Sequence, residues 1–523
     1  MPRRDYAKEL TEKVQKMEGV TVVYARPTDE TGKDWNKCKR SRHAANTVNP
    51  IRKIVDAMSV QPNPDKAPIK LHLGDPTLTG KLPPCEVVTQ ALLEAVSSHK
   101  FDGYGPSVGD LAARQAVVDK YSLEASPFTA DDVILASGAS HALQLAIEAI
   151  ANPGDNILVP NPGFPLYSTL CCPHGVEDRK YNLDMNNGAL IDLKHMESMI
   201  TKRTKAIIIN NPSNPTGAVF PRKHLEKILQ IANKYRLTII ADEIYGDLTY
   251  GGAEFIPIAS LSPKVPVITC DGIAKRWLVP GWRLGWCIVH DRYDVLADVK
   301  QGMIALSQKI VGPCALVQGA LPKILRDTPD SFFEHVKSVL SENARIVYKN
   351  LRRVPGLKVV KPHGAMYMMV GIDEELYGEE KEFVQGLIQE QSIYCLPGSA
   401  FSAPGWFRIV LAYPAEVTLE ACHRIEEFCY GQRHPGCVFP GPAAETVKEP
   451  KKTIVVSQPT VASVPASNEE DEGCCNSSDE GVGGSISSDE GEGRSISPDP
   501  ETSKLTQAPS LESISSEIID AST

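Results

Sequence analysis

The sequence predicts an α/β protein in which a large domain with a mainly parallel sheet is accompanied by a smaller α+β domain. Three observations lead to this prediction. Short apolar runs of strand length alternate with helical patterns along most of the chain. The runs are apolar on both faces, which is typical of strands that helices cover on both sides. The chain has 523 residues, 42% of them hydrophobic, so more than one core is expected.

The first elements are expected in the following order. Residues 1–40 are polar and charged and indicate a short helical or disordered arm, whereas residues 41–74 are expected to form the N-terminal part of the small domain. The large domain is expected at residues 75–330. Its strands are predicted at residues 133–136, 156–159, 206–209, 238–241, 267–269 and 287–289. Because ligands of such sheets bind at the carboxyl ends of the strands, functional residues are expected there.

The C-terminal part of the small domain is expected at residues 331–435. Its predicted elements are a long helix at 331–351, short strands near 357–360, 366–369 and 407–411, and a closing helix at 416–430. We expect the active site to lie between this domain and the large one.

The last segment, residues 441–523, has no Phe, Trp or Tyr and is rich in serine, glycine and acidic residues. Such a composition does not bury enough apolar surface to offset the entropy of ordering, so a disordered tail is predicted. The tail contains an imperfect repeat at residues 477–481 and 487–491, in which serines precede acidic residues. These serines are either sites for acid-directed kinases or part of a solvated spacer.

The charge balance argues against a nucleic-acid partner. The net charge is −10, and the 16 acidic and 5 basic residues of the tail account for all of it. The rest of the chain is therefore close to neutral, whereas a nucleic-acid surface would carry a basic stripe.

The cysteines and the N-terminus predict a cytoplasmic protein without a metal site. The 13 cysteines include no Cys-x-x-Cys pair, which favours reduced thiols. Cys171, Cys172 and His174 lie close together, but no second ligand pair follows at the spacing of a zinc site. Residues 1–17 have no apolar core, so no signal or transit peptide is expected. No apolar run approaches the roughly 20 residues that cross a bilayer.

One segment, residues 271–286, carries the strongest chemical signal. It sets Lys275 and Arg283 eight residues apart among apolar residues and glycines. An apolar setting lowers the pKa of a lysine and makes its neutral amine available as nucleophile and base. An arginine can bind a phosphate dianion through two hydrogen bonds. The alternative is that Lys275 is a surface lysine between two strands.

The segment resembles the cofactor attachment site of the fold-type I pyridoxal-phosphate-dependent aminotransferases. The resemblance covers about residues 41–430 and implies a large domain with a mainly parallel sheet of the seven-stranded type. It further implies that Lys275 holds the aldehyde of pyridoxal 5'-phosphate and serves as the catalytic base.

Two further motifs supply groups that the ring of this cofactor needs. Asp242 and Tyr245 follow a predicted strand; the resemblance pairs Asp242 with the ring nitrogen and Tyr245 with the phenolate oxygen. Asn214, in a segment with two Asn-Pro steps, is implied to contact the same oxygen and the substrate. The alternatives are a helix N-cap role for Asp242 and a plain turn around Asn214.

The phosphate cradle is expected at Gly138 and Ala139, where a strand meets an apolar helix predicted at residues 142–150. Small residues let backbone N–H groups approach an anion at a helix N-terminus, and Arg283 is implied to complete the charge. Many family members carry serine where this chain has Gly272, so one hydroxyl contact to the phosphate is missing.

Four more residues are assigned by the resemblance. Phe164 is implied to stack on the ring, with a core phenylalanine as the alternative. Tyr104 is implied to reach the phosphate of a neighbouring subunit, which implies a homodimer. Arg408 is implied to bind the substrate carboxylate, with Gly74 near the same substrate; the alternative for Arg408 is a solvated strand face.

Within the family, residues 73–77, 275–286, 364–367 and 390–397 resemble most the members that act on tyrosine. The resemblance thus implies transamination of tyrosine with 2-oxoglutarate, as in aromatic amino-acid catabolism. The acidic tail departs from the pattern. Two alternatives are kept: a pyridoxal-phosphate-dependent lyase or a transaminase of other specificity on the same fold, and a catalytically silent scaffold protein.

Overall fold

The computed structural model describes residues 38–57, 60–77, 82–122, 124–261, 264–436 and 439. The predicted polar arm at residues 1–40 lies almost wholly outside the described residues, and the predicted tail at residues 441–523 lies entirely outside them. Within the described residues, none of the helices combines the length and hydrophobicity that a membrane span requires.

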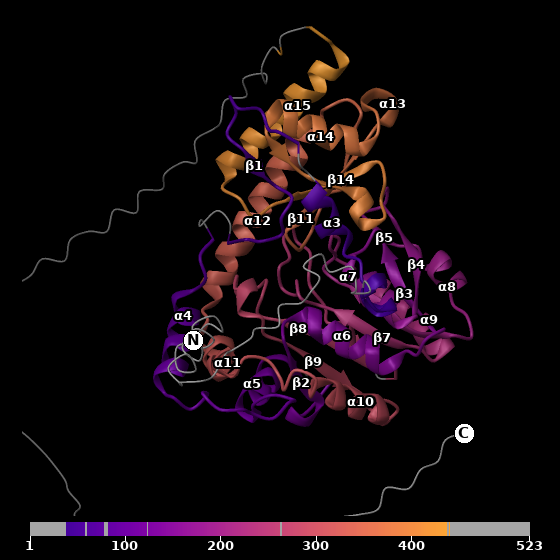
Figure 1. Ribbon diagram of the computed structural model, residues 1–523, viewed down its shortest axis with the longest axis vertical. Helices are drawn as coiled ribbons and strands as arrows, with labels where there is room; N and C mark the ends of the chain where they lie inside the picture. Colours follow the sequence, from indigo (N-terminus) through magenta and orange to yellow (C-terminus); the bar gives the residue numbers. More distant parts are fainter. Residues whose placement is uncertain are drawn as a thin grey trace, which may run out of the picture. The chain divides into compact units, whose positions relative to one another are not determined.

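The large part of the described chain is built on a mixed sheet of eight strands in the order β2-β9-β8-β7-β6-β3-β4-β5 (Figure 1). Strands β8, β7, β6, β3 and β4 pair in parallel, whereas β9 is antiparallel to both its neighbours and β5 is antiparallel to β4. The bounds are β2 (Val133–Ala136), β3 (Asn156–Asn161), β4 (Glu177–Asp184), β5 (Leu190–Ile191), β6 (Thr204–Asn210), β7 (Thr238–Asp242), β8 (Val267–Gly272) and β9 (Gly285–His290).

The prediction of an α/β fold is confirmed, and each predicted strand of this sheet is present. The sheet exceeds the seven-stranded type because the two-residue β5 adds an edge strand beyond β4. Sequence analysis did not predict β4 and β5; β4 alternates exposed and buried residues at one end of the sheet, so it lacks the continuous apolar run of the central strands.

Helices cover both faces of this sheet because alternate strand residues are buried on opposite sides. On one face, the apolar core includes side chains of α6 (Ala139–Ile150), α7 (Leu166–Cys171) and α10 (Ala297–Ser307). On the other face, two cores include side chains of α8 (Leu193–Ser198), α9 (Arg222–Tyr235), α4 (Glu86–Ser97), α5 (Leu111–Tyr121) and α11 (Ala315–Asp327). The result is a three-layer arrangement.

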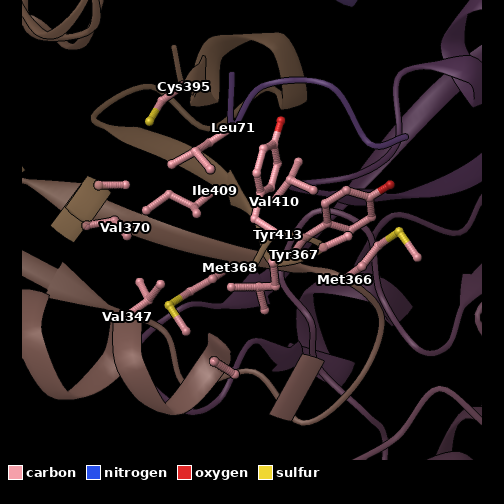
Figure 2. Packing of buried hydrophobic residues seen from close by; sticks show 14 of the residues in the cluster. Leu71, Val347, Met366, Tyr367, Met368, Val370, Cys395, Ile409, Val410 and Tyr413 are labelled. Atoms are coloured by element: carbon pink, nitrogen blue, oxygen red, sulfur yellow. The ribbon is translucent and has the colours of Figure 1, made fainter. Parts of the chain in front are cut away.

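The C-terminal elements form a second, antiparallel sheet in the order β10-β11-β14-β13. Its strands are β10 (Leu357–Val359), β11 (Tyr367–Ile372), β13 (Leu396–Pro397) and β14 (Trp406–Val410), and its helices are α12 (Asp330–Leu351), α13 (Glu374–Tyr377), α14 (Glu380–Gln391) and α15 (Ala415–Arg433). The predicted long helix and closing helix are confirmed. Figure 2 shows the shared core, with Val347 of α12 beside Met368, Val370 and Ile409 of the strands.

The N-terminal segment joins these C-terminal elements. Strand β1 (Ile69–Lys70) pairs in parallel with β12 (Ile393–Tyr394), and Figure 1 shows β1 among α12, α14 and α15. The remaining short elements are α2 (Arg42–Asn46), α3 (Pro50–Ala57), η1 (Ala130–Asp132), η2 (Cys172–His174), η3 (Ile258–Leu261), η4 (Pro280–Trp282) and η5 (Gly398–Phe401). The predicted domain boundaries stay predictions.

Candidate active site

A cavity of about 260 Å3 lies at the carboxyl ends of β6, β7 and β8, and both sheets contribute to its walls. Nine of the residues predicted from the sequence line it: Gly74, Ala139, Phe164, Asn214, Asp242, Tyr245, Lys275, Arg283 and Arg408. Gly138 is next to this lining, and Tyr104 is not part of it. The cavity therefore brings together groups that are up to 334 positions apart in the chain, from Gly74 to Arg408.

Lys275 stands in the turn that follows β8 and is half-buried between the buried residues Ala274 and Arg276. Its ammonium nitrogen Nζ donates a hydrogen bond to the carbonyl oxygen of Gly74 at 2.7 Å. The alternative of a solvated surface lysine does not hold, because the side chain enters the cavity and uses a backbone acceptor there.

Asp242 is the last residue of β7 and is buried. The hydroxyl of Tyr167 donates to its Oδ2 at 2.6 Å, and the N–H of Ile244 lies 3.5 Å from Oδ1. Burial raises the pKa of Asp242 to about 6, although both hydrogen bonds favour the ionised carboxylate. Asp242 precedes a turn and not a helix, so the N-cap alternative does not apply.

Tyr245 and Asn214 flank Asp242 from two different loops. The hydroxyls of Tyr245 and Tyr367 share a hydrogen bond of 2.8 Å. Burial raises the pKa of Tyr245 well above its ordinary value, and Tyr367 adds to this effect, so the phenol stays neutral and can donate. The backbone N–H of Asn214 donates to Oδ1 of Asn210 at 2.7 Å, which fixes the turn.

The phosphate cradle forms at the start of α6. Gly138 is the N-cap residue, with a φ of 76° that glycine adopts without steric cost. A Cβ at Gly138 would lie 2.6 Å from the Nη2 of Arg283, so a larger residue would occupy the space in front of the guanidinium. Arg283 donates to the carbonyl oxygens of Pro280 at 3.0 Å and Ser137 at 3.3 Å. Backbone N–H groups, a helix N-terminus and an arginine thus converge.

The surroundings of Gly272 explain why this chain lacks the serine that many family members carry at this position. A Cβ at Gly272 would lie 2.6 Å from the carbonyl oxygen of Leu284 and 2.8 Å from the Cα of Gly285. Because these are backbone atoms at the start of the neighbouring strand β9 and of the residue before it, they do not yield as a flexible side chain would. The close approach of β8 and β9 therefore requires glycine at this position.

Arg408 lies in β14 and is only 3% exposed, which overturns the alternative of a solvated strand face. Its guanidinium donates to Oδ1 of Asn214 at 3.0 Å and to the carbonyl oxygen of His72 at 2.9 Å. The contact with Arg408 uses the oxygen of the Asn214 amide and leaves its NH2 group for the cavity. Within the described residues no carboxylate pairs with Arg408, and its Nε has no hydrogen-bond partner. A buried guanidinium in this state is a site for an anion.

Three lining or adjacent residues were missed by sequence analysis. Tyr167 holds Asp242, Tyr367 contacts both Tyr245 and the face of Arg408 (4.3 Å from the guanidinium carbon to the ring centre), and His72 lines the wall. Tyr167 follows Phe164 by three positions, a spacing that often places two side chains on one side of a helix start. Figure 2 shows Tyr367 at the edge of the small core, with its hydroxyl directed away from Val370 and Ile409.

The other predicted residues have the following surroundings. Phe164 is half-buried, lines the cavity and also packs against the core beside α6. Its position is therefore compatible both with a residue that stacks on the ring and with a core phenylalanine. Tyr104 is 97% exposed, and its role at a second subunit stays a prediction. Cys171, Cys172 and His174 form no metal-binding group, nor do any other described residues.

The donor set fits pyridoxal phosphate. The cavity has a half-buried lysine for an aldehyde, a buried carboxylate for a ring nitrogen and two neutral donors, Tyr245 and the Asn214 amide, for a phenolate oxygen. The glycine cradle with Arg283 suits a phosphate, and the unpartnered Nε of Arg408 leaves a place for a second anion.

Comparison with known proteins agrees with this geometry. Residues 66–425 match the family model described as aminotransferase class I and II. The chain is 63% identical over 397 residues to a tyrosine aminotransferase of Caenorhabditis elegans, an alignment that covers 76% of this chain and 86% of that protein. It is 48% identical over 395 residues to a tyrosine aminotransferase of Homo sapiens, covering 75% and 87% respectively.

Solved structures give the same result. The crystal structure of a tyrosine aminotransferase from Leishmania infantum superposes with a TM-score of 0.72 at 33% sequence identity, covering 76% of this chain and 99% of that one. An alanine aminotransferase from Pyrococcus furiosus gives a TM-score of 0.70 at 32% identity, covering 75% and 100%.

Proposed function

This chain belongs to the class I and II aminotransferases, and from that premise we propose that it transaminates L-tyrosine with 2-oxoglutarate, using pyridoxal 5'-phosphate. The products are 4-hydroxyphenylpyruvate and L-glutamate. The observation that carries the proposal is a cavity with buried charges of opposite sign, Asp242 and Arg408, neither of which has a counter-ion among the described residues. Such a cavity favours a ligand pair that brings a cationic ring and a carboxylate.

The residues around Asp242 hold and tune the cofactor. When bound, pyridoxal phosphate supplies an electron sink that makes the α C–H bond of an amino acid acidic. Asp242 keeps a ring nitrogen protonated, because an ionised carboxylate beside a nitrogen favours its charged form. Tyr245 and the Asn214 amide would donate to the phenolate oxygen, and Phe164 would cover one face of the ring. Gly138, Ala139 and Arg283 bind the phosphate.

The residues around Arg408 position the substrate. Arg408 binds the α-carboxylate through its guanidinium fork, with Gly74 beside the same substrate. This contact would orient the α C–H toward Lys275, whose side-chain nitrogen would take up the α-proton and later give it back. When 2-oxoglutarate takes the place of the tyrosine-derived product in the same cavity, Lys275 would carry out the same proton transfers in the reverse order. The same amine holds the cofactor aldehyde between turnovers.

Tyrosine as the amino donor is supported by relatives that carry the name tyrosine aminotransferase, among them the proteins that are 63% and 48% identical to this chain. A lyase on the same fold would release ammonia or close a ring without needing an oxo acid as the amino acceptor. A silent scaffold would not need Lys275, Asp242 and Arg408 in one cavity.

We further propose that the active unit is a cytoplasmic homodimer. Exposed large side chains support a self-association surface: Tyr104, Ile310 and Val311 are all exposed, and the turn at Gly312 approaches the backbone of Ser107, close to Tyr104. In this arrangement Tyr104 contacts the phosphate in the partner's site. The cysteine usage of the sequence supports a reducing compartment.

The test is an absorption spectrum of the protein loaded with pyridoxal phosphate. Tyrosine should convert the cofactor to its amine form, and 2-oxoglutarate should restore the aldehyde form. A matched Lys275→Ala variant should lose turnover by several orders of magnitude, because one residue acts as both nucleophile and base. A wild-type spectrum that ignores tyrosine but responds to another amino acid would remove tyrosine as the substrate, and failure to bind the cofactor would favour the scaffold.

A further inference from the structure

Lys275 and its neighbour Arg276 point to opposite sides of the large sheet. Lys275 enters the cavity, whereas Arg276 is 3% exposed and contacts Asp271 of β8. Alternate residues of a strand face opposite sides: Cys270 belongs to the core beside α6, and Asp271 pairs across the ladder with Trp286 of the opposite core. Arg276 therefore anchors the lysine turn on the face away from the cavity.

The guanidinium of Arg276 is held from several directions. Its Nη1 donates to Oδ2 of Asp247 at 2.9 Å, and its Nη2 donates to the hydroxyl of Tyr121 at 2.7 Å and to Oδ2 of Asp271. The rings of Tyr121 and Trp277 each lie 5.1 Å from the guanidinium carbon. Such a planar fork fixes direction as well as distance, which a lysine ammonium does not.

These contacts join the two turns that carry cofactor-facing groups. Asp247 ends the turn after β7, two residues beyond Tyr245, and Asp271 is the last residue but one of β8, the strand that leads to Lys275. Both turns contain a non-glycine residue in the left-handed region, Asp247 with a φ of 61° and Leu278 with a φ of 59°. Such conformations persist only where the surroundings hold them, and the contacts of Arg276 reach both turns.

We propose that Arg276 is a positioning residue that ties the Lys275 turn to the Tyr245 turn through Asp247. It thereby sets where the Lys275 amine stands relative to the Tyr245 hydroxyl, and it acts on the reaction without touching the ligand. The inference deepens the proposed transaminase function and rests on it.

The energetics favour a geometric role over a purely stabilising one. Burial works against the charge of Arg276, yet Asp271, Tyr121 and Asp247 raise the pKa of its guanidinium above the ordinary value. The group is therefore always charged. Buried ion pairs add little net stability compared with apolar residues of similar size, so their worth here lies in the fixed geometry.

Asp247→Asn is the variant that tests the link between Arg276 and the Tyr245 turn by itself. Arg276→Ala would leave Asp271 buried without its partner and would endanger folding. The side chain of Asp247 is instead 67% exposed, and asparagine tolerates its left-handed backbone. The substitution removes one charge from the connection and leaves the Arg276 contact with Asp271 in place. Arg276→Lys is the second variant, because it keeps the charge and loses the fork.

The chain offers a matched control in Asp131→Asn. The side chain of Arg114 is 11% exposed and that of its partner Asp131 is 88% exposed, at 3.6 Å. This pair has the same design of a buried arginine with an exposed acid, but neither residue lines the cavity.

The experiment compares holoproteins by visible circular dichroism of the bound cofactor, by the affinity of the apoproteins for pyridoxal phosphate and by steady-state kinetics with tyrosine. For Asp247→Asn and Arg276→Lys we expect a changed dichroic band and a kcat lowered about tenfold or more, with KM changed less than about twofold, because a misplacement of about 1 Å can cost a hundredfold in rate. Asp131→Asn should match wild type.

Three results would overturn the inference. If wild type binds the cofactor and transaminates, and both test variants keep its dichroic band and kcat, the connection does not position Lys275 and the transaminase function stands. If Asp131→Asn shows the same losses as Asp247→Asn, the effect is general destabilisation. A wild-type protein that neither binds the cofactor nor responds to tyrosine would overturn the proposed function and this inference together.

Discussion

Replacing Tyr167 by phenylalanine should move the pH range in which the protein holds its cofactor. The Tyr167 hydroxyl donates to Oδ2 of Asp242 at 2.6 Å, and Asp242 has a pKa of about 6 because burial raises it. A hydrogen bond to a charged group contributes about 1.5 to 3 kcal/mol, and about 1.4 kcal/mol corresponds to one pKa unit. Losing this bond should therefore raise the pKa of Asp242 by about one to two units.

The consequence follows from the sign of that shift. In wild type, Asp242 is mostly ionised at neutral pH, whereas in Tyr167→Phe a large share would be protonated and unable to stabilise a cationic ring nitrogen. The affinity of the variant apoprotein for pyridoxal phosphate should fall near neutral pH and recover at higher pH. The assay is fluorescence titration of the apoprotein with the cofactor from about pH 5 to about pH 9, a range that spans both expected pKa values.

A matched control separates this effect from general loss of a buried hydroxyl. Tyr181 is also fully buried, and its hydroxyl donates to the carbonyl oxygen of Ile208 at 2.7 Å, not to a carboxylate. Tyr181→Phe should lower stability without moving the pH midpoint of cofactor affinity. An unchanged midpoint in Tyr167→Phe, or an equal shift in both variants, would refute the reasoning.

Two further predictions concern the cradle and the opposite face of the sheet. Gly138→Ala should weaken cofactor affinity and lower stability by about 1 to 3 kcal/mol, because a φ of 76° with a ψ of 168° is a conformation that is essentially restricted to glycine. Cofactor titration and urea unfolding measure the two effects, and an affinity equal to wild type would contradict the cradle. Burial raises the pKa of Glu243 to about 8, so the folded protein keeps a proton that the unfolded chain loses above about pH 4.5. The free energy of unfolding should therefore fall by roughly 5 kcal/mol as the pH rises from about 4.5 to about 8. Glu243→Gln should flatten that decline in urea midpoints, and an unaltered pH slope would show that the carboxyl does not titrate as argued.

The central strands were predictable because their physics is local. Runs such as residues 206–209 and 238–241 are apolar on both faces, and a parallel strand between helix layers needs that pattern. Strands β4 and β5 were not predicted, since the second half of β4 alternates between buried and exposed residues and β5, the edge strand beyond it, has only two residues. Strand β1 has two residues and its partner lies more than 300 positions away, so no local signal marks it.

The residues of the candidate site likewise fall into those that the sequence predicts and those that it does not. Lys275, Asp242 and Arg283 belong to short motifs whose chemistry is legible from spacing, and the cavity contains them. Tyr167 and Tyr367 were missed because their importance depends on contacts with residues 75 and 122 positions away, Asp242 and Tyr245. A tyrosine in an apolar run looks like a core residue until its hydroxyl partner is known.

Buried charges are paired on one side of the large sheet and unpaired on the side of the cavity. The unpaired charges are what make the cavity a binding site. On the far face, Arg276 is paired with Asp271 and Asp247, so its charge is balanced within the fold. On the cavity face, Asp242 and Arg408 are desolvated without balancing charges among the described residues. Since an unpaired buried charge is costly, a ligand that brings the missing charges relieves this cost on binding. The apoprotein should therefore be the less stable state, by an amount that grows with ligand concentration relative to its Kd.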